Sequence, residues 1–421
     1  MLSKLGTVAK LVTGRYTPFL AAFWDTEEEH ILKEWFGGAE FPNALPLLEQ
    51  EIGSRLGKDV GIRVLNSGRA ALQLILESLN LPLGSEILIS TFSCAGVVMP
   101  VIQSGHRPVL VDVDEQFNIR FESVLEAYTP SVKAVVVPHL SGCWSRDMDQ
   151  ILGWASEREI YVIEDVAQAH GLVRSSKYAG LFGHAGVFSA GLGKMAFGPG
   201  GGWAVSRIPE IAKALSTKTL PTEQRECVLQ RVRQFMCRYA HSPGIRGRFV
   251  VKSMIGSRTL GQNHPSADVT TGFDAYRFPI TCGSDIEANL ALAQVRKLGV
   301  IVNRRQLHAD RWRGLLKETG LKSLRMLPNE NNVFCKMLLA FVGNEGKVEH
   351  DLVRRTLWKN GVEIEPSYTP LHLRKEFAAF RRASMRITPP AFSVPVRPNL
   401  CDQDWQRIER GIESVGEKLC E

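Results

Sequence analysis

The chain has 421 residues, of which 44% are hydrophobic and 23% are charged, and its formal net charge is +7. This length is enough for a large buried core and for two domains, and the charged fraction is ordinary for a globular protein. No apolar run approaches the ~18 residues that a membrane-spanning helix needs. The eight cysteines form no C-x-x-C pair, which argues against a zinc site and predicts free thiols in the cytoplasm.

The N-terminal segment is basic. Its first 24 residues contain Lys4, Lys10 and Arg15 but no acidic residue. The apolar run is interrupted by Arg15 and Pro18, and no convincing cleavage site follows, so the pattern does not indicate a secretory signal. We predict an N-terminal basic arm or helix over residues 1–35.

Four apolar runs rich in Val and Ile alternate with helical stretches in the first half of the chain. This alternation predicts an α/β fold, in which a mainly parallel sheet is covered by helices on both faces as a three-layer large domain. The predicted strands are 86–90, 108–113, 133–140 and 160–165, and the helical stretches include 69–79 and 147–159. We assign this domain to residues 36–270.

A basic segment follows the predicted sheet. Residues 207–258 contain eleven Lys and Arg but only three Glu, a local net charge of +8. The pattern fits a solvated helical face, or a surface that attracts an anion such as a phosphorylated substrate. No recognisable nucleic-acid-binding motif accompanies the charge, so we expect no nucleic-acid partner.

The second half of the chain changes character. Residues 284–320 read as one or two long helices, and we assign 271–320 as connecting helices. A strand-like run (332–342), a helix closing on a glycine (347–361) and a final helix (402–419) then predict a smaller α+β domain over 321–421.

A single lysine, Lys194, lies in the glycine-rich stretch "FSAGLGKMAFGPGGGWAV" (188–205). A phosphate-binding loop of the Walker type needs G-x-x-x-x-G-K-[ST], but Phe188 replaces its first glycine and Met195 follows the lysine. A dinucleotide fingerprint is also absent, because the first strand–helix loop, "NSGRAAL" (66–72), lacks G-x-G-x-x-G. Neither of these phosphate-binding motifs explains Lys194.

Covalent chemistry offers a better explanation for Lys194. Pyridoxal 5'-phosphate (PLP) needs a lysine, a carboxylate facing its pyridine nitrogen and an anion-binding cradle for its phosphate. Asp165 follows a predicted strand, and the carboxyl ends of parallel strands meet at one edge of a sheet. The other candidates for this edge are Ser67, Gly68, Arg69 and Ser189. Each has a simpler alternative, such as a helix cap or a turn, but together and in this order they favour a PLP site.

Several separated blocks resemble the DegT/StrS family of PLP-dependent sugar aminotransferases. They are "NSGRAALQLIL", "GHRPVLVDVD", "VVVPHLSGCWSRDMDQI", "VIEDVAQAHG", "GVFSAGLGKMAFGPGGGWAV", "DIEANLALAQVRKL", "SYTPLHL" and "FSVPVRPNLCDQDWQRI". The resemblance runs from about Phe36 to the end, with a less familiar stretch around 207–270. It implies the aspartate-aminotransferase fold, which is fold type I of the PLP enzymes.

The resemblance also implies residue roles. Lys194 would be the covalent anchor of PLP and the proton shuttle, Asp165 would pair with the pyridine nitrogen, and Gln168 would lie beside the phenolic oxygen. The phosphate would be held by Gly68, Arg69 and Ser189. The family works as a homodimer with shared sites, and the amino donor would be glutamate or glutamine. The acceptor would be a keto group, by family on a nucleotide-activated sugar or a related cyclitol.

Three departures from the family pattern stand out. Cys94 occupies the position at which the family has an aromatic ring stacked on the cofactor, and Phe92 is a candidate substitute. Arg69 replaces a Thr or Ser in the phosphate turn. Ala275 replaces an asparagine that reaches the neighbouring subunit's phosphate, and Arg69 or Arg277 could compensate for it.

Two alternatives to the aminotransferase remain open from the sequence. One is a PLP-dependent enzyme of the same fold with a different reaction or a substrate other than a sugar. The other is a degenerate member that binds a ligand without turnover. In the dehydratase branch of the family a histidine replaces the lysine, so Lys194 argues against that branch.

Overall fold

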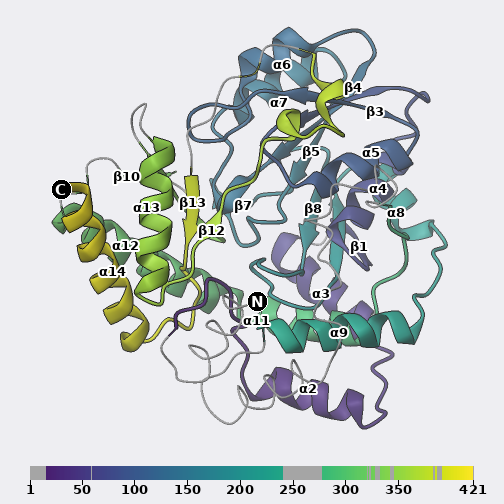
Figure 1. Ribbon diagram of the computed structural model, residues 1–421. Coiled ribbons are helices and arrows are strands. Elements are labelled where there is room, and N and C mark those ends of the chain that lie inside the picture. Colours follow the sequence, from purple (N-terminus) through teal and green to yellow (C-terminus); the bar gives the residue numbers. More distant parts are fainter. Residues whose placement is uncertain are drawn as a thin grey trace.

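A computed structural model of the chain describes residues 16–57, 59–239, 277–319, 321, 324–327, 332–341, 346–382, 385 and 391–420. Within these residues, seven strands form one large sheet in the order β1-β9-β8-β5-β4-β2-β3 (Figure 1). Only β9 runs against the direction of the other strands, because it pairs antiparallel with both β8 and β1. In sheet order the strands span Gly61–Leu65, Gly202–Ser206, Ala185–Ser189, Tyr161–Asp165, Val132–Pro138, Glu86–Ser90 and Arg107–Val111.

Helices cover both faces of this sheet. One face packs against α3 (Ala44–Leu56), α6 (Phe121–Ala127), α7 (Met148–Glu157) and α11 (Asp285–Arg296). The other face packs against α4 (Gly68–Ser78), α5 (Val98–Gln103) and α8 (Pro209–Thr217). The three-layer α/β prediction is therefore confirmed.

Strand β4 shows why the sheet needs helices on both sides. Its residues Val135 and Val137 belong to the apolar cluster of one face, whereas Ala134 and Val136 belong to the cluster of the other. Because successive side chains of a strand point to opposite faces, a strand that is apolar at every position must be covered twice. Each of these four side chains is at most 1% exposed.

A second, antiparallel sheet forms the core of a smaller domain. Its strand order is β10-β11-β13-β12, with bounds Leu324–Leu327, Met337–Phe341, Ala391–Val394 and Glu365–Pro366. Helices α12 (Leu298–Glu318), α13 (Gly346–Lys359) and α14 (Asp402–Cys420) lie beside it (Figure 1). A separate apolar cluster joins the two domains, with Phe92 and Phe117 on one side and Leu338 and Ala391 on the other.

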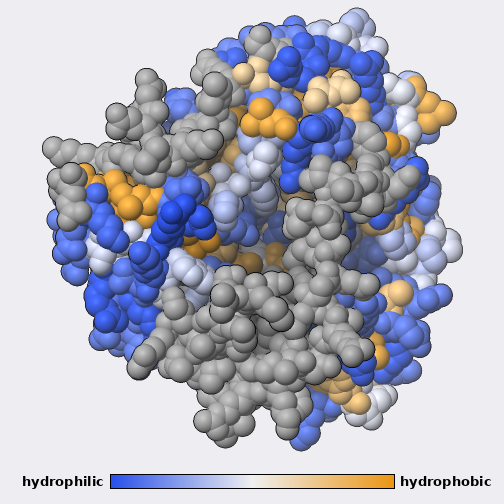
Figure 2. All heavy atoms as spheres, viewed as in Figure 1, coloured by the Kyte–Doolittle hydropathy of each residue, from blue (hydrophilic) through white to orange (hydrophobic). Residues whose placement is uncertain are grey.

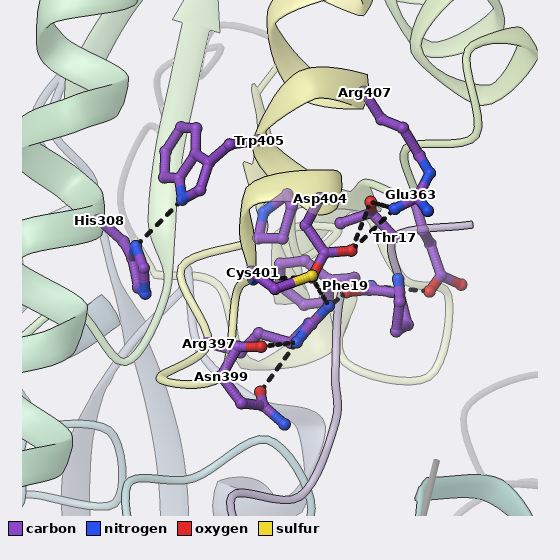
Figure 3. Close-up of polar contacts among 12 residues, drawn as sticks. Thr17, Phe19, His308, Glu363, Arg397, Asn399, Cys401, Asp404, Trp405 and Arg407 are labelled. Atoms are coloured by element: carbon purple, nitrogen blue, oxygen red, sulfur yellow. Dashed lines mark hydrogen bonds and ion pairs between the residues drawn. The ribbon is translucent and has the colours of Figure 1, made fainter. Parts of the chain in front are cut away.

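The segment 16–24, here called the strap, connects the small domain to the large one. Thr17 pairs in parallel with Val362, and its hydroxyl donates a 2.8 Å hydrogen bond to Asp404 at the start of α14 (Figure 3). At the other end of the strap, the Trp24 indole donates to the carbonyl of Phe197 in the large domain, over 3.1 Å. The strap then leads into α2 (Thr26–Phe36), which packs with α9 (Arg225–Tyr239) and α11.

The described surface is mostly hydrophilic. Figure 2 shows blue residues over most of the part that is not grey, with apolar residues in separate patches. The most exposed large apolar side chain is Leu83, and Leu307 and Leu373 are also exposed. Isolated apolar residues of this kind are normal on a protein surface.

Local predictions agree closely with the structure. The predicted strand 86–90 is β2, and the long helical stretch 284–320 forms two helices, α11 and α12. In the basic segment, α8 and α9 are helical, while 240–276 lies outside the described residues. Residues 1–15 of the predicted basic arm also lie outside them. The predicted domain boundaries stay predictions.

Candidate active site

The N-terminus of α4 lies against the end of β8. A Cβ atom on Gly68 would approach the Ser189 Cβ and the Phe188 carbonyl oxygen to 3.1 Å. The Ser67 hydroxyl caps the helix by accepting from the Ala70 N–H over 3.2 Å. The backbone at Ser67 pairs in parallel with Gly201, which ties this turn to the segment before β9. The N-terminus of a helix favours an anion. The structure brings Ser67, Gly68 and Ser189 together at this terminus, and their contact with a phosphate stays a prediction.

Arg69 and Cys94 lie side by side near this cradle. Both approach Gly96: a Cβ atom there would lie 2.9 Å from Arg69 Cδ and 3.5 Å from Cys94 Sγ. The Arg69 guanidinium lies 4.9 Å from the ring centroid of Phe278. Burial lowers the pKa of Arg69, and Cys94 acts in the opposite direction. The Arg69 guanidinium therefore already has a cation–π partner, the ring of Phe278. The predicted contact of Arg69 with a phosphate stays a prediction.

Lys194 lies in the loop between β8 and β9. Its N–H donates to the Gly191 carbonyl over 3.2 Å, and Gly193, within the same turn, has a φ of +70°. The strap packs on this loop, because a Cβ atom on Gly193 would lie 3.4 Å from a Leu20 methyl. Behind the loop, the Cys335 thiol from the small domain donates to the Gly193 carbonyl over 3.2 Å. The position of Lys194 is thus fixed by the turn of its own loop, by the strap and by Cys335 of the small domain.

The surroundings of Lys194 hold it as a cation. Burial alone would lower the pKa of Lys194, but the acidic groups around it act in the opposite direction and raise it above the usual value. The strongest of these is Tyr368, and the others are Cys335, Cys94 and Asp165. Asp165 ends β5 and accepts from the Ala167 N–H over 3.0 Å. The predicted lysine and carboxylate therefore lie within electrostatic range of each other.

Gln168 is held at both ends. Its Oε1 accepts from the Ser141 N–H and its Nε2 donates to the Tyr368 hydroxyl, each over 2.8 Å. Burial raises the pKa of Tyr368, so this phenol keeps its proton at neutral pH. Because the Tyr368 oxygen accepts from Gln168, this bond does not use the proton of the phenol. Gln168 therefore positions Tyr368 in the site.

Two residues of this site, Tyr368 and Lys336, were not expected from the sequence. Tyr368 stands within the "SYTPLHL" block, but nothing in that block distinguished it from its neighbours. Lys336 is the single charged residue in the apolar run "NVFCKMLLAFV" (332–342), and this isolation was the available signal. Both residues come from the small domain and are placed by its packing on the large one.

Phe92, His170, Ala275 and Arg277 do not contribute in the same way to this site. Phe92, the candidate ring substitute, stacks on Phe117 with ring centroids 4.1 Å apart, so one of its faces is already covered. His170 packs edge-on against Phe188, and burial lowers its pKa to about 3. It is therefore a neutral, structural histidine. Ala275 lies outside the described residues, and Arg277 is exposed.

The residues present fit PLP. Gly68 lets the N-terminus of α4 approach Ser189 closely, a helix N-terminus suits a phosphate, and the lysine and the carboxylate suit the ring. The mixed seven-stranded sheet, the small antiparallel domain and this lysine loop define the class of PLP-dependent aminotransferases of fold type I. None of the helices in the described part of the chain is both long and apolar enough to cross a membrane.

Comparison with known proteins identifies the family. The model of the DegT/DnrJ/EryC1/StrS aminotransferase family matches residues 41–240 and 280–413, so the chain belongs to that family. The L-glutamine:2-deoxy-scyllo-inosose aminotransferase of Streptoalloteichus tenebrarius is 27% identical over 357 residues, 81% of this chain and 74% of that protein.

A second relative matches more closely over a shorter stretch. The UDP-N-acetyl-3-dehydro-α-D-glucosamine 3-aminotransferase of Acidithiobacillus ferrooxidans is 35% identical over 170 residues, 40% of this chain and 46% of that protein. Among solved structures, Helicobacter pylori PseC, an aminotransferase of pseudaminic acid biosynthesis, matches with a TM-score of 0.73 at 15% identity. That match covers 96% of this chain and 100% of PseC, and it supports the fold.

Proposed function

We propose that the protein transfers an amino group from L-glutamine or L-glutamate to a keto group of a nucleotide-activated sugar or a related cyclitol. The observation that carries this proposal is the position of Lys194, a half-buried lysine within electrostatic range of Asp165 and close to the Cys94–Arg69 pair beside the α4 cradle. The named substrates of the two relatives support the acceptor class. The glutamine-dependent relative supports the donor.

Each residue of the site would have a defined task. When bound, PLP supplies an aldehyde that reacts with amines and a ring that withdraws electrons from the substrate carbon. Gly68 and Ser189 would hold its phosphate, and Asp165 would hold a proton at its ring nitrogen. Lys194 would anchor it and move a proton at Nζ. Gln168 would orient the Tyr368 hydroxyl, and the strap would exclude water from the lysine loop.

The oligomeric state of the protein and its cellular location are also proposals. A homodimer with shared sites follows from the family resemblance, and a solution mass of twice that of the chain would test it. A cytoplasmic location agrees with the six cysteines that have free thiols in the described residues, since disulfides are rare in a reducing compartment.

The spectrum of the purified protein tests the cofactor assignment. We expect an absorbance band that borohydride abolishes by fixing the cofactor to Lys194. The Lys194→Ala variant should bind PLP without this reducible link, whereas Lys213→Ala, an exposed lysine of α8, should behave as wild type.

Added amino acids then test the reaction. L-Glutamine or L-glutamate should convert the band to that of the pyridoxamine form. A wild-type protein that takes up no PLP would refute the cofactor assignment. A PLP-bound protein that no amino donor converts would refute transamination alone and favour another PLP reaction.

A further inference from the structure

A small cavity lies where the two domains meet beside Gln168 and Tyr368. Its apolar wall includes Phe92 and Leu338, and its polar residues include Gln168, Tyr368, Ser367 and Lys336. Its interior space is about 10 Å³, roughly what one water molecule needs and far below the roughly 300–1,000 Å³ of pockets that enclose whole small ligands. The cavity therefore excludes a sugar ring and leaves room only for a small polar group at the end of a substrate.

Lys336 is the cation of this cavity. It stands on the segment that leads into β11, and its N–H donates to the Ser141 carbonyl over 3.2 Å. The ammonium hydrogen-bonds to Glu365 and lies 5.3 Å from the ring centroid of Tyr368 and 5.7 Å from that of Phe19. An ammonium has three donors, and in the described part of the chain Lys336 Nζ uses one of them.

The two lysines lie close to each other, because Cys335, which precedes Lys336, donates to the carbonyl of Gly193, which precedes Lys194. Both Lys336 and Lys194 interact electrostatically with Tyr368. The side chain of Lys336 is only 13% exposed, while that of its partner Glu365 is 39% exposed. A buried, strongly held ammonium with unused donors, next to the reacting lysine, is suited to bind an anionic group that enters the cavity.

The geometry fits a group attached close to the reacting carbon. In an amino acid the α-carboxylate and the α-amino group share one carbon, so the residue that binds the carboxylate must lie near the lysine that handles the amine. Lys336 satisfies this condition through Tyr368. The tight cavity also favours a planar carboxylate over a larger phosphate or sugar.

We propose that Lys336 binds the α-carboxylate of the amino donor, with Glu365 as its partner when the donor is absent. The inference rests on the proposed function, because it places the donor within the same site. It assigns donor recognition to a residue of the small domain, whereas the cofactor would be held by the large domain.

The test is the donor half-reaction of the PLP-bound enzyme, followed by its absorbance without any acceptor. In the Lys336→Met variant, the L-glutamine concentration that gives half the limiting rate should rise roughly 10- to 100-fold, as expected for the loss of a charged hydrogen bond. The limiting rate should change less than about threefold. Lys336→Gln, which retains a hydrogen-bond donor for Glu365, should behave similarly, and Lys336→Arg should recover most of the affinity.

A second donor separates the α-carboxylate from the other end of the molecule. L-Isoglutamine has the γ-carboxylate of L-glutamate but a carboxamide in place of the α-carboxylate, so wild type should prefer L-glutamate to it, and Lys336→Met should nearly abolish that preference. Arg354→Met is the matched control, because Arg354 is an exposed cation of α13 that pairs with Asp351.

Two results would have different meanings. If wild type responds to L-glutamine but both neutral Lys336 variants keep its half-saturating concentration, the inference is wrong while the proposed function stands. That result would also be obtained if Lys336 bound an anion of the acceptor. If wild type responds to no amino acid, the proposed function fails and the inference fails with it.

Discussion

Replacement of Glu164 tests how the carboxyl end of β5 is held. Glu164 stands beside Asp165, and its side chain is completely buried. Its Oε1 accepts from the N–H groups of Phe182 and Gly183, over 2.6 and 2.7 Å. Its Oε2 accepts from the Gly180 N–H over 2.8 Å and faces His139 Nε2 at 2.9 Å. One carboxylate therefore organises four donors around the strand that carries Asp165.

Glu164→Gln is nearly isosteric, yet it should be strongly destabilising. If its remaining oxygen faces the two loop N–H groups, its amide nitrogen faces the Gly180 N–H and the His139 ring. The ring cannot reverse its tautomer without loss, because His139 Nδ1 already accepts from the Ser145 N–H over 3.2 Å. At least one buried donor is then left without an acceptor.

A buried donor left without an acceptor costs about 1–3 kcal/mol. For a chain of this length, that cost corresponds to a melting temperature lower by roughly 1–3 °C, at about 2.1 cal/mol/K of unfolding entropy per residue. Thermal unfolding of the PLP-free protein measures it. Glu157→Gln, which replaces an exposed carboxylate of α7, is the control and should shift the unfolding midpoint by less than about 1 °C. A Glu164→Gln midpoint equal to that of the control would refute the reasoning.

Two further predictions concern packing and pH. Gly186→Ala places a Cβ atom 2.6 Å from the Gly180 carbonyl oxygen and 2.7 Å from its Cα, so it should cost about 3 kcal/mol or more in a urea titration. Gly153→Ala in α7, with no atom within 4 Å of the added Cβ, should be neutral or stabilising by up to about 1 kcal/mol. Burial opposes ionisation of Asp404, but Arg397 outweighs it and holds the pKa of Asp404 below its usual value. The stability due to Asp404 is therefore complete above about pH 4 and is lost below it. Between pH 6 and 3, the thermal-unfolding midpoint of the wild type should fall more steeply than that of Asp404→Asn. Equal slopes for the two proteins would contradict this prediction.

The elements that the sequence predicted well are those whose environment is uniform along their length. Strands such as β2 and β5 are buried on both faces, so they read as continuous apolar runs and their bounds were nearly correct. The direction of β9 was not predictable in this way. A buried strand has the same composition whether it runs parallel or antiparallel, and its direction depends on the path of the glycine-rich loop that contains Lys194.

The residues of the candidate site also differ in how well the sequence could predict them. Gly68, Asp165, Ser189 and Lys194 lie at the ends of strands or the start of a helix in one sheet, so the topology of that sheet alone brings them to one edge. Lys336 reaches the site through the docking of the small domain. That docking depends on contacts between Phe92, Leu338 and their neighbours, which no local sequence pattern encodes.

The strap has a consequence for the order in which the protein is synthesised. Thr17 and Asp404, which its hydroxyl contacts, are separated by 387 positions. At about 5–20 residues per second, the ribosome needs roughly 20–80 s to make the partner of a segment that emerged near the start. Once Ser206 has been made, the nascent chain can form the seven-stranded sheet and the lysine loop. The Thr17 end of the strap, however, still lacks its partner in the small domain.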